Sequence, residues 1–484
     1  MGISSKPIAC LALSISLALA ANPISAQKKE IQLPSLGDAT SGIVSPQQEY
    51  KLGQAWARSF RAQVPTSVDA QLADYTEKLM ARLAEHSELH SKQLDIIMVE
   101  NPTLNAFAVP GGVVGVHIGL FNYAQSEGQI SAVLAHELAH LSQRHFARGV
   151  EQQQRNTLPM LAALMTSLVI AATTSGDAGL AALSATQAAA IDAKLRFSRQ
   201  NEQEADRIGI QTMAAAGLDP YQAPEMFEQM LKATQFSRRP PEFLLTHPVT
   251  EKRIADTRNR ARRYVERPLP PSLDFHLMRS RVRLALSETP SQAAKAFASE
   301  LEGHSLLPEA SRYGLLLSYI EMKDIKKAGE QLDILLEGNP NHVSYIIAKA
   351  DLAAAAGNYD GALMDLRLAL KKNPHNHPIS VRLAELYMES GQYHRGEQLL
   401  VKHSRQRPHD TYVWYLLAEI HGLTGDILNL HQARAEYFIL NGIYDKALHH
   451  LKLAQKMARG NYRLSTILEE KTRQVYNMIE DQKG

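Results

Sequence analysis

The chain has very little cysteine, few aromatic residues and no strong excess of charge. Its 484 residues include a single cysteine, Cys10, and only 6% aromatic residues, while 52 basic residues balance 50 acidic ones. A chain with one cysteine cannot form an internal disulfide bond. The balanced charge, without a long basic run, does not indicate nucleic acid as a partner. A hydrophobic fraction of 45% is ordinary for globular proteins, and this length predicts about two to four domains.

Residues 1–26 have the pattern of an export signal. Lys6 provides a positive start, Ile8 to Ala20 form an apolar run, and small residues lead to Ala26 before a polar stretch. The run is short for a membrane span, which favours a cleaved signal peptide over a retained anchor. We expect cleavage near Ala26, with Ala20 or Ala21 as the competing position. Cys10 would leave with this segment.

Residues 27–267 are predicted to form one mostly helical unit with a small β-sheet. The run from Leu94 to Val99 is predicted to be a buried strand, and residues 105–109 and 113–117 a hairpin around Pro110-Gly111-Gly112. Residues 129–148 are predicted to form one helix, because apolar residues recur on one face and Gly149 stands at the position of a C-terminal cap.

A proline-rich segment and a repeat follow. Three prolines between Arg267 and Pro271 cannot continue a helix and predict a boundary, so residues 268–305 are expected to be a linker with leading helices. In residues 306–484, single residue types recur every 34 residues, as in the series Pro340, Pro374, Pro408 and Gly357, Gly391, Gly425. This period is typical of tetratricopeptide repeats, which stack into an α-solenoid that binds other chains. The register becomes irregular after Gly425.

The segment His136-Glu137-Leu-Ala-His140 has the spacing of a catalytic zinc motif. Two histidines four residues apart on a helix point in nearly the same direction, so both imidazoles can bind one Zn²⁺. Glu137 lies beside the first ligand and can act as the general base that takes a proton from zinc-bound water. The competing interpretation is a helix with two surface histidines. The flanking apolar face argues against it, because a helix that carries metal ligands must be packed to hold their geometry.

A third ligand is expected farther along the chain. Glu202 and Asp206 lie four residues apart, on one face of a predicted helix, whereas Glu204 points elsewhere. We assign Glu202 to the metal and Asp206 to a hydrogen bond with a ligand histidine, with Glu204 as the competing ligand. Without the histidine motif, a solvated acidic helix face would be the simpler interpretation.

Four motifs together resemble one family. The histidine motif with Arg144-His145, the segment from Ser198 to Gly209, the hairpin Asn105–Gly112 and Thr246–Ile254 are similar to the gluzincin family of the CAAX-processing peptidase, heat-shock protein X and Oma1. The resemblance implies a mostly α fold, in which an α-helical zinc metallopeptidase domain with a small β-sheet precedes the repeats. It also implies one Zn²⁺ per chain and hydrolysis of peptide bonds.

The resemblance to members of this family that also carry an export signal and repeats implies a more specific role. They are periplasmic endopeptidases that act on unfolded or stalled outer-membrane barrel proteins at the barrel-assembly machinery, and they also assist assembly as chaperones do. In such a member a loop histidine is thought to occupy the fourth zinc position and keep the enzyme latent. The matching residue is His247, for which a transition-state donor or a turn histidine before Pro248 are the alternatives.

Two further features leave alternatives open. An extended substrate is expected to add to the strand edge near Ala106 to Val109, although these residues also fit an ordinary core. The apolar stretch from Leu158 to Ala172 is short for a membrane span and is expected to form helices over the cleft, as a lid or a contact with a membrane surface. A chaperone-like adaptor with secondary proteolysis, and a membrane-embedded peptidase, are the competing functions.

Overall fold

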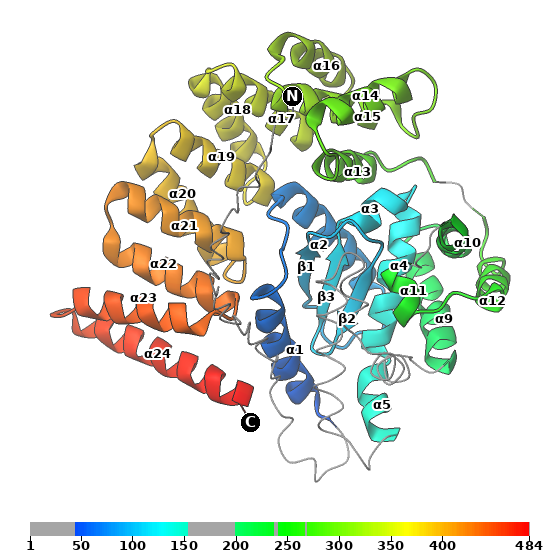
Figure 1. Cartoon of the computed structure of the whole chain (residues 1–484), viewed down its shortest axis with the longest axis horizontal. Helices are drawn as coiled ribbons and strands as arrows, with labels where there is room; N and C mark the ends of the chain where they lie inside the picture. Colours follow the sequence, from blue (N-terminus) through cyan, green and yellow to red (C-terminus); the bar gives the residue numbers. More distant parts are fainter. Residues whose placement is uncertain (1–43, 153–198, 237–240, 267–268, 484) are drawn as a thin grey trace, which may run out of the picture. The chain divides into compact units, whose positions relative to one another are not determined.

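The computed structural model describes residues 44–152, 199–236, 241–266 and 269–483. The predicted export signal and the apolar stretch from Leu158 to Ala172 lie outside these residues. The predicted fold class is confirmed: helices dominate, a small sheet lies in the first half, and helical pairs follow (Figure 1). Among the described residues, no helix combines the length and apolar character that crossing a membrane requires.

The first half of the chain contains three strands and nine described helices. The elements are α1 Pro46–Arg61, α2 Ala70–Glu85, β1 Asp95–Val99, β2 Ala106–Val109, β3 Val113–His117, α3 Gly119–Tyr123, α4 Glu127–Ser142, α5 His145–Gln152, α9 Arg199–Ala215, α10 Gln222–Phe236, α11 Glu242–Thr246 and α12 Glu251–Ala261.

The sheet has the order β1-β3-β2, with β1 parallel and β2 antiparallel to β3. The predicted strand and hairpin are therefore confirmed. Gly111 and Gly112 have φ of 82° and 84°, a conformation that residues with a Cβ rarely adopt, and they allow the tight turn between β2 and β3. Among the described residues, β2 is an edge strand of the sheet, and it contacts α4.

The prediction of one continuous helix over residues 129–148 is wrong. α4 begins after Ser126, whose side chain accepts a hydrogen bond from the Gln129 N–H, and it ends at Ser142. Arg144 has φ of 50°, which breaks the helix before α5 begins. The Arg144 side chain is held by Glu49, at 3.1 Å, and by the carbonyl of Val44. These distant partners stabilise the turn, and the expected cap residue Gly149 lies inside α5.

α9 packs against α4 at a close approach made by Gly209. A Cβ at this position would lie 3.2 Å from the backbone nitrogen of His136, so glycine lets the two helices come together. Glu202 and Asp206 lie on the same helix, about two turns and one turn before Gly209, respectively. The contact therefore positions both carboxylates beside the histidine motif.

The second half consists of paired helices. They are α13 Leu273–Ala285, α14 Pro290–Leu301, α15 Pro308–Glu321, α16 Ile325–Gly338, α17 Val343–Ala355, α18 Tyr359–Lys372, α19 His377–Glu389, α20 Tyr393–Gln406, α21 Thr411–Thr424, α22 Ile427–Leu440, α23 Tyr444–Met457 and α24 Tyr462–Lys483. The starts of α17, α19 and α21 are 34 residues apart, as the sequence predicts. Gly357, Gly391 and Gly425 have φ of 81°, 74° and 78° and end the first helix of each pair.

The hydrophobic core continues across the proline-rich segment. One cluster of buried side chains includes residues of α2, α3 and α4 together with residues of α13 to α17. Phe121 and Phe275, on the two sides of this segment, stack with ring centroids 6.1 Å apart. The leading helices thus share a core with the first half, and the domain boundaries predicted from the sequence stay a prediction.

Candidate active site

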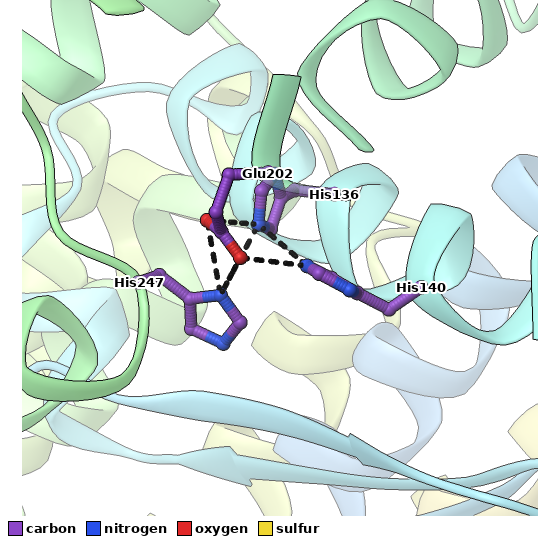
Figure 2. A group of neighbouring side chains, drawn as sticks. All are labelled: His136, His140, Glu202 and His247. Atoms are coloured by element: carbon purple, nitrogen blue, oxygen red, sulfur yellow. Dashed lines mark hydrogen bonds and ion pairs between the residues drawn. The ribbon is translucent and has the colours of Figure 1, made fainter. Parts of the chain in front are cut away.

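Four buried side chains from three elements converge on one point. His136 and His140 lie on α4, Glu202 lies on α9, and His247 follows the last residue of α11 (Figure 2). Their exposed fractions are 1%, 5%, 3% and 3%, so bulk water does not solvate them. Each offers one nitrogen or oxygen atom to a group whose atoms all lie within 4.8 Å of one another.

The distances within this group match those of a tetrahedral metal site. Two donors at about 2.05 Å from one tetrahedral ion would lie about 3.3 Å apart. The Nε2 atoms of His136 and His140 are 3.0 Å apart, and each lies 3.5 Å from a carboxylate oxygen of Glu202. The Nδ1 of His247 lies 3.4 Å from His136 Nε2 and 3.1 Å from Glu202 Oε1. This donor set of three imidazoles and one carboxylate fits a single Zn²⁺.

Glu137 lies beside the group without belonging to it. Its Oε1 is 3.5 Å from His247 Nε2, and the side chain is buried. Burial raises the pKa of Glu137, while His247, His136 and a hydrogen bond from the backbone of Ala108 act in the opposite direction. A carboxylate with a raised pKa accepts a proton more readily near neutral pH. The contact with Ala108 also places Glu137 directly beside the edge strand β2.

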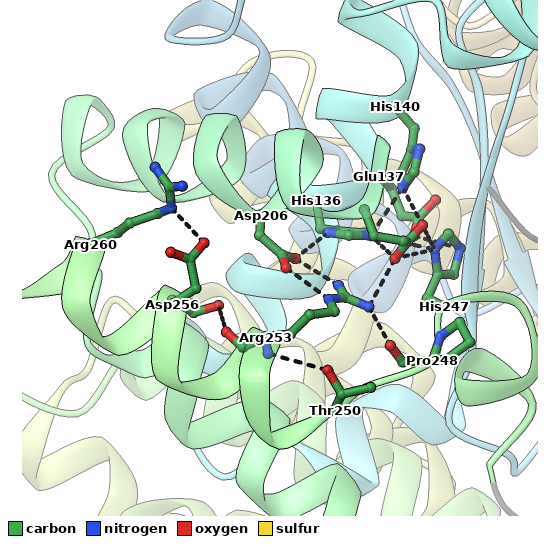
Figure 3. Close-up of polar contacts among 12 residues, drawn as sticks. His136, Glu137, His140, Asp206, His247, Pro248, Thr250, Arg253, Asp256 and Arg260 are labelled. Carbon is green, nitrogen blue, oxygen red and sulfur yellow. Dashed lines mark hydrogen bonds and ion pairs between the residues drawn. The ribbon is translucent and has the colours of Figure 1, made fainter. Parts of the chain in front are cut away.

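A buried arginine holds the two carboxylates of α9. Arg253 on α12 donates to both oxygens of Asp206, at 2.8 and 2.7 Å (Figure 3). Its third nitrogen lies 2.9 Å from Glu202 Oε2. Asp206 Oδ1 in turn lies 3.0 Å from His136 Nδ1. Asp206 therefore occupies the position beside a candidate ligand histidine that the sequence predicts. No role of Arg253 was predicted from the sequence, because no local spacing links it to a partner 47 residues earlier.

These contacts control the charges in the site. Burial by itself would raise the pKa of Glu202, but His247 and His136 hold it well below its ordinary value. Burial lowers the pKa of His136, yet hydrogen bonds to Asp206 and Glu202 raise it to about 9. Burial lowers the pKa of His140, which favours a neutral ring. The group therefore combines a carboxylate anion with imidazoles whose nitrogens face one another.

Glu204, the competing ligand in the sequence analysis, points away from the group. Its Oε2 lies 3.2 Å from His145 Nε2 and 2.8 Å from Arg148 NH1. His145 Nδ1 lies 2.8 Å from His140 Nδ1. His145 belongs to a motif that carries the family resemblance, but no role was predicted for it. In a continuous helix His140 and His145 would point in different directions.

The short helix α11 ties the His247 segment to the edge strand. Glu242, at its start, accepts hydrogen bonds from Thr103 Oγ1, at 3.2 Å, and Asn105 Nδ2, at 3.4 Å. These partners lie in the residues that lead into β2. Burial raises the pKa of Glu242 to about 7. The segment that carries His247 is thus anchored beside the strand that borders the site.

Comparison with known proteins agrees with this arrangement. Residues 70–261 match the model of Peptidase family M48, and residues 353–420 match a tetratricopeptide repeat model. The beta-barrel assembly-enhancing protease of Escherichia coli K12 is 32% identical over 431 residues, which are 88% of this chain and 88% of that protein. The protein of that name from Yersinia pestis is 30% identical over 417 residues, 86% of each chain.

A more distant relative shares the first half. The mitochondrial metalloendopeptidase OMA1 of Schizosaccharomyces pombe is 32% identical over 181 residues, 37% of this chain and 50% of that protein. The family resemblance carried by the four motifs is therefore confirmed. Because a relative at 32% identity matches 88% of the chain, and the peptidase family model matches the part that holds the buried histidine and carboxylate group, the chain is a metallopeptidase of family M48 and belongs to the family of the beta-barrel assembly-enhancing proteases.

Proposed function

We propose that the protein is a periplasmic zinc endopeptidase that hydrolyses peptide bonds of misassembled outer-membrane barrel proteins and also assists their assembly. The observation that carries the peptidase part is the near-tetrahedral spacing of His136, His140, Glu202 and His247. The first three are the proposed metal ligands. Bound zinc would supply Lewis-acid activation of a water molecule and of the scissile carbonyl.

The residues of the chain supply the other parts of the reaction. Glu137 takes the proton from the attacking water and returns it to the leaving amine, a role that its raised pKa supports. Asp206 Oδ1, 3.0 Å from His136 Nδ1, favours the tautomer with the hydrogen on Nδ1, which leaves Nε2 free for the metal. Arg253 balances the charge of Asp206 and Glu202 where water is excluded.

The edge strand supports a binding mode for substrate. Among the described residues, β2 pairs with β3 along one side only, and its other side faces α4 and Glu137. An extended peptide that pairs with β2 would pass its carbonyl groups beside the metal group. Unfolded barrel strands have the extended backbone that such pairing requires, and this chemistry agrees with the name of the relatives, beta-barrel assembly-enhancing protease.

His247 is proposed to keep the resting site closed. A neutral imidazole in the fourth position displaces the water molecule that the reaction needs. The His247 Nδ1 distances of 3.1 and 3.4 Å to the other candidate ligands support this role over that of an unconnected turn histidine. The His247→Ala variant is expected to raise peptide hydrolysis several-fold, and a fall in hydrolysis would instead support the transition-state donor.

The peptidase proposal is tested by Glu137→Gln with metal analysis. Purified protein is expected to hold one zinc ion, and Glu137→Gln should keep the zinc while turnover of an unfolded barrel protein falls by at least about 100-fold. Removal of zinc by a chelator should abolish turnover, and added zinc should restore it. Absence of stoichiometric zinc from folded protein would contradict the assignment.

The same variant separates the peptidase from an adaptor. The repeats, with their stacked helical pairs, are the feature that favours an adaptor that docks the barrel-assembly machinery. If cells with Glu137→Gln assemble outer-membrane proteins as well as wild-type cells do, the adaptor role is the main one. If assembly defects or stalled barrel proteins accumulate, proteolysis is required.

A further inference from the structure

The outer nitrogen of each ligand histidine has a different kind of partner. His136 Nδ1 faces the carboxylate of Asp206, at 3.0 Å. His140 Nδ1 instead faces a second imidazole, since His145 Nδ1 lies 2.8 Å away and is buried. Beyond His145, the contacts continue to Glu204 Oε2 at 3.2 Å. A chain of polar contacts therefore leads from the metal group outward to the surface.

The hydrogen positions along this series of contacts follow from the metal group at one end and the carboxylate of Glu204 at the other. His140 Nε2 faces the metal group and must present a lone pair there, so the hydrogen of a neutral His140 ring is on Nδ1. Two Nδ1 atoms at 2.8 Å need one donor and one acceptor, so His145 Nδ1 accepts. The hydrogen of His145 is then on Nε2, which faces an acceptor, the carboxylate of Glu204. All three contacts are satisfied by one set of tautomers.

The backbone break in the histidine helix makes this contact geometrically possible. Residues five apart on a continuous helix differ by about 140° in direction, which would point the two rings apart. Arg144, with φ of 50°, breaks the helix between them, and the two Nδ1 atoms lie 2.8 Å apart. The ion pair of Arg144 with Glu49 on α1, at 3.1 Å, holds this conformation. The positive φ of Arg144, which residues with a Cβ rarely adopt, is thus stabilised by a specific partner, Glu49.

We propose that His145 and Glu204 are a positioning pair for His140, equivalent in role to Asp206 for His136. The proposal rests on the proposed metal site. The parallel extends to the counter-charges, because Arg253 pairs with Asp206 and Arg148 pairs with Glu204 at 2.8 Å. The two carboxylates differ in exposure, because Asp206 is buried, whereas the Glu204 side chain is 27% exposed.

The test measures zinc affinity by competition with a chelator of known affinity. Partners of ligand histidines typically contribute about 10–100-fold to metal affinity. His145→Leu, which fills the buried space but accepts no hydrogen bond, should weaken zinc binding at least about tenfold. His145→Gln offers an amide oxygen to His140 and an amide N–H to Glu204, and it should recover most of this loss. Unfolding of the metal-free variants is measured in parallel.

A variant at the outer end and a matched control complete the test. Glu204→Ala should weaken zinc binding several-fold, and in the presence of His145→Leu it should add almost nothing further. Arg207→Ala, at an exposed position of α9, should leave zinc affinity unchanged. Wild-type affinity in His145→Leu, or equal losses in His145→Gln and His145→Leu, would overturn the positioning role. If wild-type protein binds no zinc, the proposed metal site itself fails.

Discussion

Arg407, the residue that follows α20, donates two hydrogen bonds to the carboxylate of Glu77 on α2, 330 residues earlier in the chain. The two distances are 2.8 and 2.6 Å, the geometry of a bidentate ion pair. At a second place, Arg58 on α1 donates to the hydroxyl of Tyr444 on α23, at 2.9 Å. The repeats therefore contact the first helices of the peptidase half at two separate positions.

The Arg407–Glu77 pair is expected to couple the two halves of the chain. In a double-mutant cycle with Arg407→Met and Glu77→Gln, urea denaturation should give a coupling free energy of about 1 kcal/mol, because both side chains are partly exposed to water. The exposed neighbour Arg405→Met, combined with Glu77→Gln, should show additive effects. Additivity in the Arg407 cycle as well would mean that this contact does not stabilise the folded chain.

Gly209→Ala is expected to lower zinc affinity while changing the free energy of unfolding of the metal-free protein little. The new Cβ meets backbone atoms of α4 at 3.2 Å, which cannot rotate away, so α9 must shift from α4 and carry Glu202 with it. Alanine also favours the helix by about 1 kcal/mol, so the net stability of the metal-free protein should change little. We expect a clear loss of zinc affinity in equilibrium titration.

The control for this prediction is Gly329→Ala, an interior position of α16. A Cβ there meets no atom within 4 Å, so stability should rise by about 0.5–1 kcal/mol without any effect on zinc. Unchanged zinc affinity in Gly209→Ala would show that the helix contact does not position Glu202.

Arg253→Met should destabilise the metal-free protein by about 3–5 kcal/mol, because the buried carboxylates of Asp206 and Glu202 lose their common partner. Chemical denaturation with chelator present measures this effect. Arg260→Met, on the same helix, breaks a partly exposed pair with Asp256 and should cost less than about 1 kcal/mol. Similar losses for both variants would argue against a special role of the buried pair.

Glu242 should make stability depend on pH near neutrality. Its pKa is raised by burial to about 7 in the folded state, so the folded chain holds a proton that the unfolded chain has released. The stability that this bound proton contributes is fully present below the ordinary pKa of a glutamate, and it is lost as pH rises through about 7. The nearby His117 offers no compensating charge, because burial lowers its pKa to about 3.

Glu242→Gln is therefore expected to flatten the dependence of unfolding free energy on pH between about 4.5 and 7. The amide keeps an oxygen that accepts from Thr103 and Asn105 but carries no charge to be buried. Above pH 7 the variant should be at least as stable as the wild type in urea denaturation. Glu251→Gln, at an exposed position of α12, should leave the slope unchanged, and an equal effect of both variants would rule out the burial of Glu242 as the cause.

Much of the site could be predicted because it depends on periodicity within one element. Two histidines four residues apart share a face on any α-helix, and Glu202 and Asp206 share a face for the same reason. The hairpin followed from glycines at a turn, and the repeats followed from their period of 34 residues. These features depend on neighbours close in sequence, where backbone geometry is nearly constant.

The errors and omissions occur where distant residues decide the outcome. The histidine helix ends early because Glu49, 95 residues before Arg144, holds Arg144 in a conformation that its own residue type disfavours. Arg253 joins Asp206 across 47 residues, and no spacing rule relates them. His145 belongs to one of the motifs that carry the family resemblance, but its contact with His140 depends on the turn at Arg144, which the sequence did not predict.

By itself, the sequence determined which chemical groups are present and which of them share a helix face: the imidazoles of His136 and His140, the carboxylate of Glu202 and the repeated helical pairs. Only the tertiary structure decided which groups meet, because the approach of α9 to α4, the return of His145 and the position of His247 depend on the packing of separate elements. Helical geometry sets directions within one element, whereas contacts between elements depend on the buried surfaces that hold them together.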